Sequence, residues 1–282
     1  NALKQVVLQQ RVIHADETPV TIMRMGDDEK KPKKGYVWAY ATTQYNPVQA
    51  VIYDFQDSRS GQHAEEFLNG WQGHLVCDDY SGYKARFKSG DVIEVGCMAH
   101  ARRKFHELHV TGKSQIAEQA LLMIQKLYAI EAELRKKTDG TAEDRREYRQ
   151  LHSQPVMQQL YEWLNQHHLT VPSSSPTAKA INYTLKRWPA LSRYLDDGNL
   201  PIDNNWVENQ MRPWALGRKN WLFAGSLRSG QRAANIMTLI QSAKLNGLDP
   251  YAYLSDVLKR LPTHKVTQIE ELLPHCWKPK SN

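Results

Sequence analysis

The sequence changes its texture near residue 111, and this change constrains the fold more than any other feature. Before it, short runs rich in β-branched and aromatic residues alternate with segments of helical spacing. The predicted strands, in chain order, are Val12–Ala15, Tyr36–Thr43, Val48–Phe55, His74–Cys77 and Asp91–Cys97. Because these runs are mostly apolar on both faces, they are typical of a central sheet that is covered on both sides. The first part of the chain is therefore predicted to be α/β.

Turn and cap signals order these strands. Asn46-Pro47 predicts a turn that pairs the second and third strands as a hairpin, and a charged loop, Gly26–Gly35, precedes them. Ser60 is a suitable N-cap for a helix over residues 61–68. The spacing predicts a further helix over His100–His109. The expected order is three strands, a helix, a strand, a short segment, a strand and a helix.

After residue 111 only helical signals remain, up to about residue 198. An apolar stripe predicts a helix over Ser114–Lys137, and two more follow over Ala142–His152 and Val156–His168, with Pro155 breaking them. Ser175-Pro176 then starts a helix that runs through Arg187. This stretch is an all-α block.

The last part of the chain is also helical. Asp203 is a candidate N-cap for a helix that Pro213 limits to about two turns. Gly230–Asn246 is a strong helix, and Asp249-Pro250 starts another through Arg260. Thr267 with Glu270 predicts a capping box for a last short helix. We divide the chain into residues 1–110, 111–199, 200–246 and 247–282.

Composition narrows the class of protein. The net charge of +7 favours a polyanionic partner, most simply nucleic acid. Three cysteines are too few for a disulfide framework, which indicates a reducing cytoplasm. No apolar run approaches the ~18 residues of a membrane helix. Because the sequence begins at Asn1 without a methionine, we expect it to be the C-terminal portion of a longer protein.

Three carboxylates lie where a metal site would need them. Asp16 is predicted at the end of the first strand, Asp78 at the end of the fourth, and Glu208 on the helix after the all-α block. Such positions can converge above a sheet edge, and carboxylate oxygens are the ligands that Mg²⁺ and Mn²⁺ prefer. Taken singly, each residue is more typical of a turn or of a solvated helix face than of a metal ligand.

Six sequence blocks together resemble a known family, the insertion-sequence-66 family of bacterial transposases. The blocks are HADETPV (14–20), CDDYSGY (77–83), GCMAHARRKF (96–105), IDNNWVEN (202–209), RPWALGRKNWLFAGS (212–226) and NGLDPYAYLSDVL (246–258). The similarity covers nearly the whole chain and is weakest in the all-α block.

The resemblance implies a DDE transposase with an RNase H-like α/β core, an all-α insertion and a helical C-terminal extension. It also implies Asp16, Asp78 and Glu208 as the catalytic ligands, which we expect to hold two Mg²⁺ or Mn²⁺ ions. The implied activity is DNA strand cleavage at the element ends and transfer to target DNA. Implied partners are these DNAs and further copies of the chain; the family's upstream region, with a DNA-binding helix-turn-helix, is absent from this sequence.

Neighbouring residues leave alternatives. Asp79 competes with Asp78, but adjacent strand residues face opposite ways, and the family pattern places the ligand first. Glu17, next to Asp16, is interpreted as a supporting or surface residue. Cys97 and His100 form a C-x-x-H pair that predicts either a structural lock near the site or, with Cys77, a zinc site that lacks a full ligand set.

Basic residues cluster around these candidates. We expect phosphate contacts from Arg102, Arg103, Lys104, Arg212, Arg218 and Lys219. A solvated basic face is the alternative, and Arg212 is also placed to pair with Glu208 one turn away. Nearby tryptophans are expected to be mainly core residues, with base stacking as the other role: Trp206, Trp214 and Trp221.

Other classes are disfavoured. The sequence contains neither a phosphate-binding G-x-x-x-x-G-K-[ST] loop nor a G-x-G-x-x-G motif, so no nucleotide cofactor is expected. Two functional alternatives to a transposase stay open: another RNase H-like nuclease or resolvase, and a catalytically inactive DNA-binding remnant of a transposase.

Overall fold

The computed structural model describes residues 1–23, 32–137 and 140–279. Its contacts divide the chain into two compact units, which we describe separately. The sheet unit comprises residues 1–75, 80–93 and 205–282, and the helical unit comprises residues 76–79 and 94–204. Among the described residues, no helix combines the length and the apolar character needed to cross a membrane.

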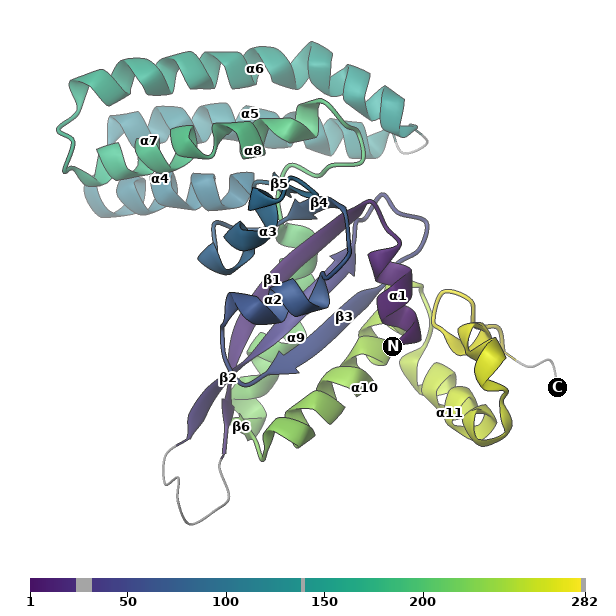
Figure 1. Ribbon diagram of the computed structural model, residues 1–282. Helices are drawn as coiled ribbons and strands as arrows, with labels where there is room; N and C mark the ends of the chain where they lie inside the picture. The colour runs from purple at the N-terminus through teal and green to yellow at the C-terminus, as the bar shows by residue number, and fades with distance from the viewer. Residues whose placement is uncertain (24–31, 138–139, 280–282) are drawn as a thin grey trace. The chain divides into compact units, whose positions relative to one another are not determined.

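A mixed sheet forms the centre of the sheet unit (Figure 1). Its described strands are β1 (Val12–Ile22), β2 (Lys33–Thr42), β3 (Val51–Gln56), β4 (Gly73–Val76), β5 (Val92–Val95) and β6 (Phe223–Ala224). The order is β3-β2-β1-β4-β5, and β6 pairs in parallel with the end of β1. The first three strands form an antiparallel meander. The predicted α/β class, strand sequence and hairpin are therefore confirmed.

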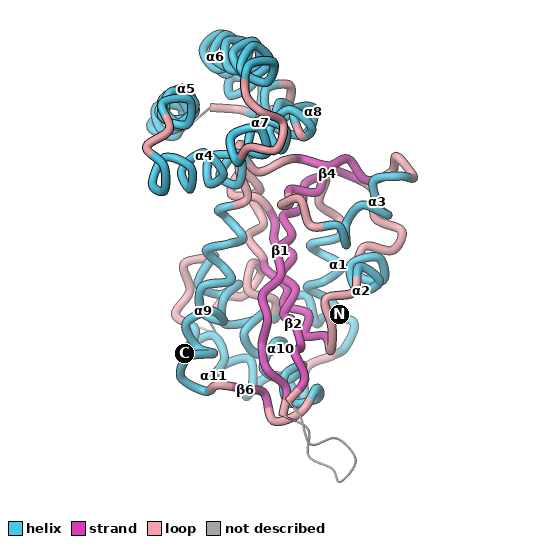
Figure 2. Tube along the Cα trace, turned by 90° about the vertical axis from the view of Figure 1, so that its left-hand side faces the viewer, coloured by secondary structure: helices cyan, strands magenta, loops and turns pink. Residues whose placement is uncertain are grey.

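One face of this sheet is covered by α9 (Asn205–Trp221) and α10 (Leu227–Leu245), and the other by α1 (Ala2–Leu8) and α2 (Gly61–Phe67). Figure 2 shows the strands edge-on between α9 and the pair α1 and α2. Alternation along β2 explains the division, because Val37, Ala39 and Ala41 pack under α9 and α10. On the opposite face, Tyr40 stacks on Phe67 of α2 with ring centroids 3.7 Å apart.

The edge strand β3 is protected by polar side chains of α10. The Val51 N–H donates to Ser242 Oγ at 3.1 Å, and the Tyr53 N–H donates to Thr238 Oγ1 at 2.9 Å. Both hydroxyl residues are buried and lie one helical turn apart. An unpaired sheet edge would otherwise be open to association with another strand.

Caps and turns of the sheet unit largely follow the sequence. Ser60 caps α2 through the Gln62 N–H, and Asp249 caps α11 (Pro250–Arg260) as predicted. The capping box at Thr267 is wrong, because residues 266–272 form a 3₁₀ segment, η4 (Val266–Leu272), without a side-chain cap. A short 3₁₀ turn, η1 (Ser81–Tyr83), and a helix, α3 (Lys84–Lys88), precede β5, and η3 (Leu261–Thr263) follows α11. Most of the predicted charged loop Gly26–Gly35 lies outside the described residues, and its end belongs to β2.

The helical unit consists mainly of packed helices: α4 (Met98–Gly112), α5 (Gln115–Lys136), α6 (Ala142–Thr170), α7 (Pro176–Lys186), α8 (Trp188–Ser192) and η2 (Arg193–Leu195). The predicted break at Pro155 is wrong, because α6 runs through it. The lost hydrogen bond concerns the carbonyl of Leu151, whose side chain is exposed, and buried Ser153 and Met157 hold the helix on both sides of the proline.

A buried ion pair joins two of these helices. Arg149 of α6 donates to both carboxylate oxygens of Glu131 of α5, at 2.7 and 2.8 Å, and both side chains are almost completely buried. The same guanidinium donates to the backbone carbonyls of Tyr194 and Leu200. These contacts satisfy a charge that would otherwise be costly in the interior.

Candidate active site

Asp16 lies in the middle of β1 rather than at its end, which corrects the sequence prediction. The polar residues Asp-Glu-Thr-Pro gave no indication in the sequence that the strand continues. Pairing with β2 extends it to Ile22. Asp16 is opposite Ala39 of β2, and Ala39 belongs to the core beneath α9 and α10. Because directly opposite residues project from the same face, the half-buried Asp16 side chain is on the α9 face of the sheet.

Glu17 is on the opposite face. Its carboxylate accepts hydrogen bonds from Arg59 Nε at 2.9 Å and from the Tyr83 hydroxyl at 2.9 Å. The Glu17 side chain is only 1% exposed, so it is a buried structural residue rather than a surface one. The two neighbouring acids of β1 therefore have separate surroundings.

Glu208 is in the first turn of α9, and this helix runs along β1. Near the start of α9, Trp206 Nε1 donates to the Thr42 carbonyl at 2.8 Å, and Thr42 is the cross-strand partner of Ile13. Near its end, Arg218 donates to Thr18 Oγ1 at 3.0 Å. The helix is thus fixed at both ends against the stretch of β1 that contains Asp16.

A further contact joins the first part of α9 to the sheet. Asp16, Ala39 and Tyr53 are successive partners across β1, β2 and β3. The Tyr53 hydroxyl donates to the backbone carbonyl of Gln210, so this line across the sheet meets α9 two residues after Glu208. Asp16 thus lies on the face of the sheet that α9 covers, and the half-buried Glu208 lies in the first turn of that helix.

Asp78 and Asp79 follow β4 and belong to the helical unit. The Asp79 carboxylate accepts a hydrogen bond from Arg187, whose side chain is 5% exposed and also donates to Glu94 at 2.9 Å. Asp79 thus helps to neutralise a buried guanidinium. Asp78 is half-buried.

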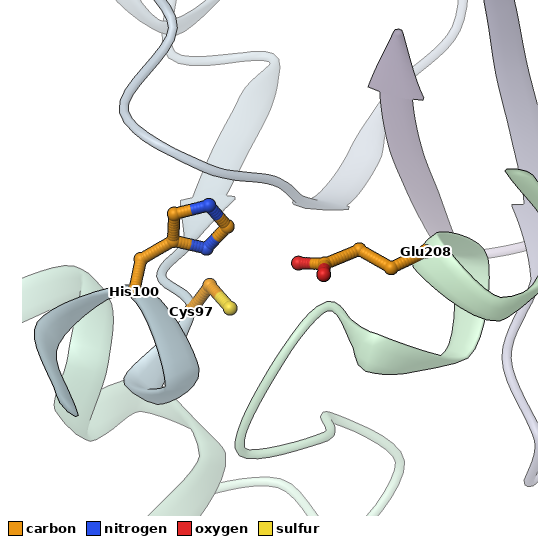
Figure 3. Close-up of side chains that lie close together, drawn as sticks. All are labelled: Cys97, His100 and Glu208. Carbon is orange, nitrogen blue, oxygen red and sulfur yellow. The ribbon is translucent and has the colours of Figure 1, made fainter. Parts of the chain in front are cut away.

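Cys97 anchors the segment that leads into α9. It precedes α4 as the N-cap residue, and its Sγ accepts a hydrogen bond from the Asn204 N–H at 3.2 Å. The Met98 N–H donates to the Ile202 carbonyl at 3.1 Å. A ring nitrogen of His100 lies within 4.8 Å of Cys97 Sγ. Figure 3 shows both side chains at the start of α4 and the Glu208 side chain extending from α9.

The expected phosphate-binding residues fall into two groups. Arg102, Arg103 and Lys104 are exposed on α4 of the helical unit, and Arg103 lies 3.4 Å from His100 Nε2. The others are on α9 of the sheet unit: Arg212, Arg218 and Lys219. Arg212 and Lys219 are exposed, whereas the half-buried Arg218 donates to Thr18 and to the Pro19 carbonyl.

The tryptophans divide as expected. Trp214 is buried against Tyr53, and Trp206 is half-buried with its indole N–H bonded to Thr42. Trp221 is exposed. Sequence reasoning did not single out Arg187 or Asn204, because a buried arginine at a helix end and a backbone donor in an Asn-Asn pair carry no signal of their own.

Comparison with known proteins decides the family. The model of the family "Transposase IS66 family" matches residues 1–232, and that of the "IS66 C-terminal element" matches residues 238–275. The chain belongs to the IS66 transposase family. This confirms the resemblance drawn from the six sequence blocks.

Three curated proteins are similar to the chain over most of its length. Two proteins of Sinorhizobium fredii (strain NBRC 101917 / NGR234), "Uncharacterized protein y4jD" and "Uncharacterized protein y4qI", are each 39% identical to the chain. The matches cover 94% and 95% of this chain, and 53% and 51% of the relatives. A third protein of that organism, "Uncharacterized protein y4hP", is 35% identical over 94% of the chain and 50% of its own length. The chain therefore spans about half the length of these curated relatives.

Proposed function

We propose that this chain is the catalytic core of a DDE transposase, which cleaves DNA strands at the ends of an insertion sequence and joins the freed 3′-hydroxyls to target DNA. Asp16, Asp78 and Glu208 would be its catalytic carboxylates. The observation that supports the proposal is that Asp16 lies on the sheet face that α9 covers and that Glu208 lies in the first turn of α9, in a member of the IS66 transposase family.

The strand order supports an RNase H-like core. In the order β3-β2-β1-β4-β5, an antiparallel meander is followed by strands added next to β1. This arrangement puts β1 at the centre of the sheet, with β4 beside it, and Asp78 follows β4 by two residues. Two of the proposed carboxylates thus come from neighbouring strands and the third from the helix that covers β1.

The proposed residues suit a hard divalent cation. All three donors are carboxylates, which favour Mg²⁺ or Mn²⁺ over softer metals. The adjacent acids have other roles, since Glu17 holds Arg59 and Tyr83 while Asp79 holds Arg187. When bound, a pair of such ions supplies positive charge that stabilises the attacking and leaving oxygens of a phosphodiester.

The remaining residues would bind and position DNA. Exposed Arg102, Arg103, Lys104, Arg212 and Lys219 are proposed to contact phosphates, which gives affinity without sequence information. Arg218 would act mainly by fixing α9 to β1. Cys97 would hold the segment before α9 through Asn204, and thereby the position of Glu208. Joining two element ends to one target would require further copies of the chain.

A strand-transfer assay tests this function. The complete gene product would be incubated with a plasmid carrying both ends of its own element and with a target plasmid, in Mg²⁺ or in a chelator. We expect Mg²⁺-dependent cleavage and covalent joining of element 3′ ends to the target. Cleavage without joining would instead indicate a nuclease or resolvase, and DNA binding without cleavage would indicate an inactive remnant.

A further inference from the structure

The connection between α9 and α10 exposes large apolar side chains. Trp221, Leu222 and Phe223 are 43%, 65% and 42% exposed, and Leu216 and Leu227, which are near them in sequence, are also exposed. We call residues 221–223 the apolar tip. Apolar side chains gathered in this way on a surface indicate a contact with a partner.

The backbone of the apolar tip is strained at Leu222. Its φ of 62° lies in the left-handed region, which a leucine adopts only at a cost. The conformation is imposed from both sides, because the Leu222 N–H donates to the Arg218 carbonyl at 3.0 Å and Phe223 and Ala224 pair with β1. Glycine would suit this backbone better, and the Leu222 side chain gains little from packing. Neither the backbone conformation nor the packing of the side chain explains why this position is a leucine.

Trp221, the first residue of the apolar tip, packs against α9. Its ring lies edge-on to the buried Trp214, with centroids 5.6 Å apart. It also covers Gly217, where an added Cβ would lie 2.4 Å from the indole. Trp221 is therefore fixed to α9, and Leu222 and Phe223 follow directly after this fixed residue.

The stretch of sequence that contains the apolar tip carries charges of one sign only. Residues 209–248 contain no Asp or Glu, and their cations are Arg212, Arg218, Lys219, Arg228, Arg232 and Lys244. Lys219 and Arg228, which flank the tip in sequence, are exposed. A two-fold contact with a second copy would place this basic surface against itself, which is unfavourable. A polyanion would pair with these positive charges, and the stacked bases of DNA would provide an apolar contact for the apolar tip.

We propose that the apolar tip is a DNA wedge: Leu222 and Phe223 insert between base pairs of the bound duplex, while Lys219 and Arg228 contact the flanking phosphates. Apolar side chains inserted in this way unstack a base step and bend the duplex. The inference rests on the proposed function in that DNA is the partner. It adds a distortion step that the carboxylates and phosphate contacts do not require.

The test uses the complete gene product carrying Asp16→Asn, so that binding is measured without cleavage. The probes are element-end duplexes with 2-aminopurine at successive positions, whose fluorescence rises when a base is unstacked. We expect a rise at one step with the parent protein. Leu222→Gly should abolish this rise and weaken binding to intact duplex about tenfold, the order of a lost base contact. It should not lower the melting temperature, because glycine relieves the strain at this position.

Two controls make the result specific. Lys113→Gly makes the same replacement at the other described non-glycine residue with positive φ, at the end of α4, and should change neither fluorescence nor affinity. A duplex with a mismatch at the unstacked step should restore the affinity of Leu222→Gly, because that step is already open.

Three outcomes would overturn the wedge. The first is a Leu222→Gly protein that binds and unstacks DNA as its parent does; the proposed function would then stand without the wedge. The second is a change of self-association in the absence of DNA, which would assign the apolar tip to a second copy. The third is a parent protein that binds no DNA, which would remove the proposed function as well.

Discussion

Adjacent acidic residues of this chain have different surroundings, because successive strand side chains face opposite ways and because their hydrogen-bond partners differ. Asp16 shares a sheet face with α9, whereas Glu17 is buried on the other face with Arg59 and Tyr83. The sequence allowed Asp16 to be preferred over Glu17 only through the resemblance, while side-chain alternation gives a physical reason for it. For Asp78 and Asp79, the discriminating partner is Arg187, about a hundred residues away in sequence, which no local pattern could reveal.

A paired substitution tests the choice between these two aspartates. Asp78→Asn should abolish Mg²⁺-dependent cleavage, because it removes a proposed ligand. Asp79→Asn should retain most of the cleavage and lower the free energy of unfolding by about 1 kcal/mol, since it weakens a partly exposed ion pair. Cleavage assays and denaturant unfolding of both variants give the answer. Equal loss of cleavage in two folded proteins would contradict the assignment.

The half-buried Asp54 gives a separate prediction about pH. Burial raises the pKa of this carboxyl above its ordinary value, although Gln56 and the charge of Lys4 oppose the shift. A raised pKa in the folded state means that stability falls as the pH rises from the unfolded value, about 3.9, through the folded one. Asp54→Asn should therefore raise the melting temperature at pH 7. The gain should vanish near pH 3, where Asp54 is protonated in both states; a gain independent of pH would contradict the account.

Several helix starts were predicted from their caps, whereas the helix ends predicted at prolines were wrong. Ser60, Ser175 and Asp249 cap the helices expected of them. Pro155 and Pro213 were both read as helix ends, yet α6 and α9 continue through them because tertiary packing outweighs one lost hydrogen bond. In α9, Trp214 is buried directly after the proline, so the core requires the helix there. The contact of Arg218 with Thr18 of β1 depends on this longer helix, and the sequence could not supply it.

The position of α9 can be tested through two adjacent cations. Arg218→Ala should lower the free energy of unfolding by about 1 kcal/mol, because it removes hydrogen bonds to Thr18 and Pro19. Lys219→Ala should leave stability unchanged and reduce the slope of log K against log[salt] for duplex DNA by about 0.9. Unfolding curves and salt titrations separate the two effects. A stability loss confined to Lys219→Ala would show that α9 is fastened differently.

At the scale of the whole molecule, the fold class could be predicted from the sequence, whereas the long-range contacts could not. The helix-only stretch begins at α4 (Met98–Gly112), so the change of texture near residue 111 falls inside its first helix, and the family models cover almost the whole chain. Residues 76–79, which include both Asp78 and Asp79, cluster by contacts with the helical unit although they follow a sheet strand. A single sequence gives no signal for such long-range contacts. Asp16 and Glu208 belong to the sheet unit by this division, and Asp78 belongs to the helical unit.

The most direct test of the central claim is strand transfer by single variants of the complete gene product. Asp16→Asn, Asp78→Asn and Glu208→Gln should each reduce joining by more than about 100-fold, since even the outer partners of metal ligands are worth 10–100-fold. Each should still bind element-end DNA. Glu17→Gln, a matched neighbour on the other face of β1, should retain joining when corrected for folded protein. Strand transfer that survives Asp16→Asn or Glu208→Gln, or that is lost equally in Glu17→Gln, would contradict the proposed active site.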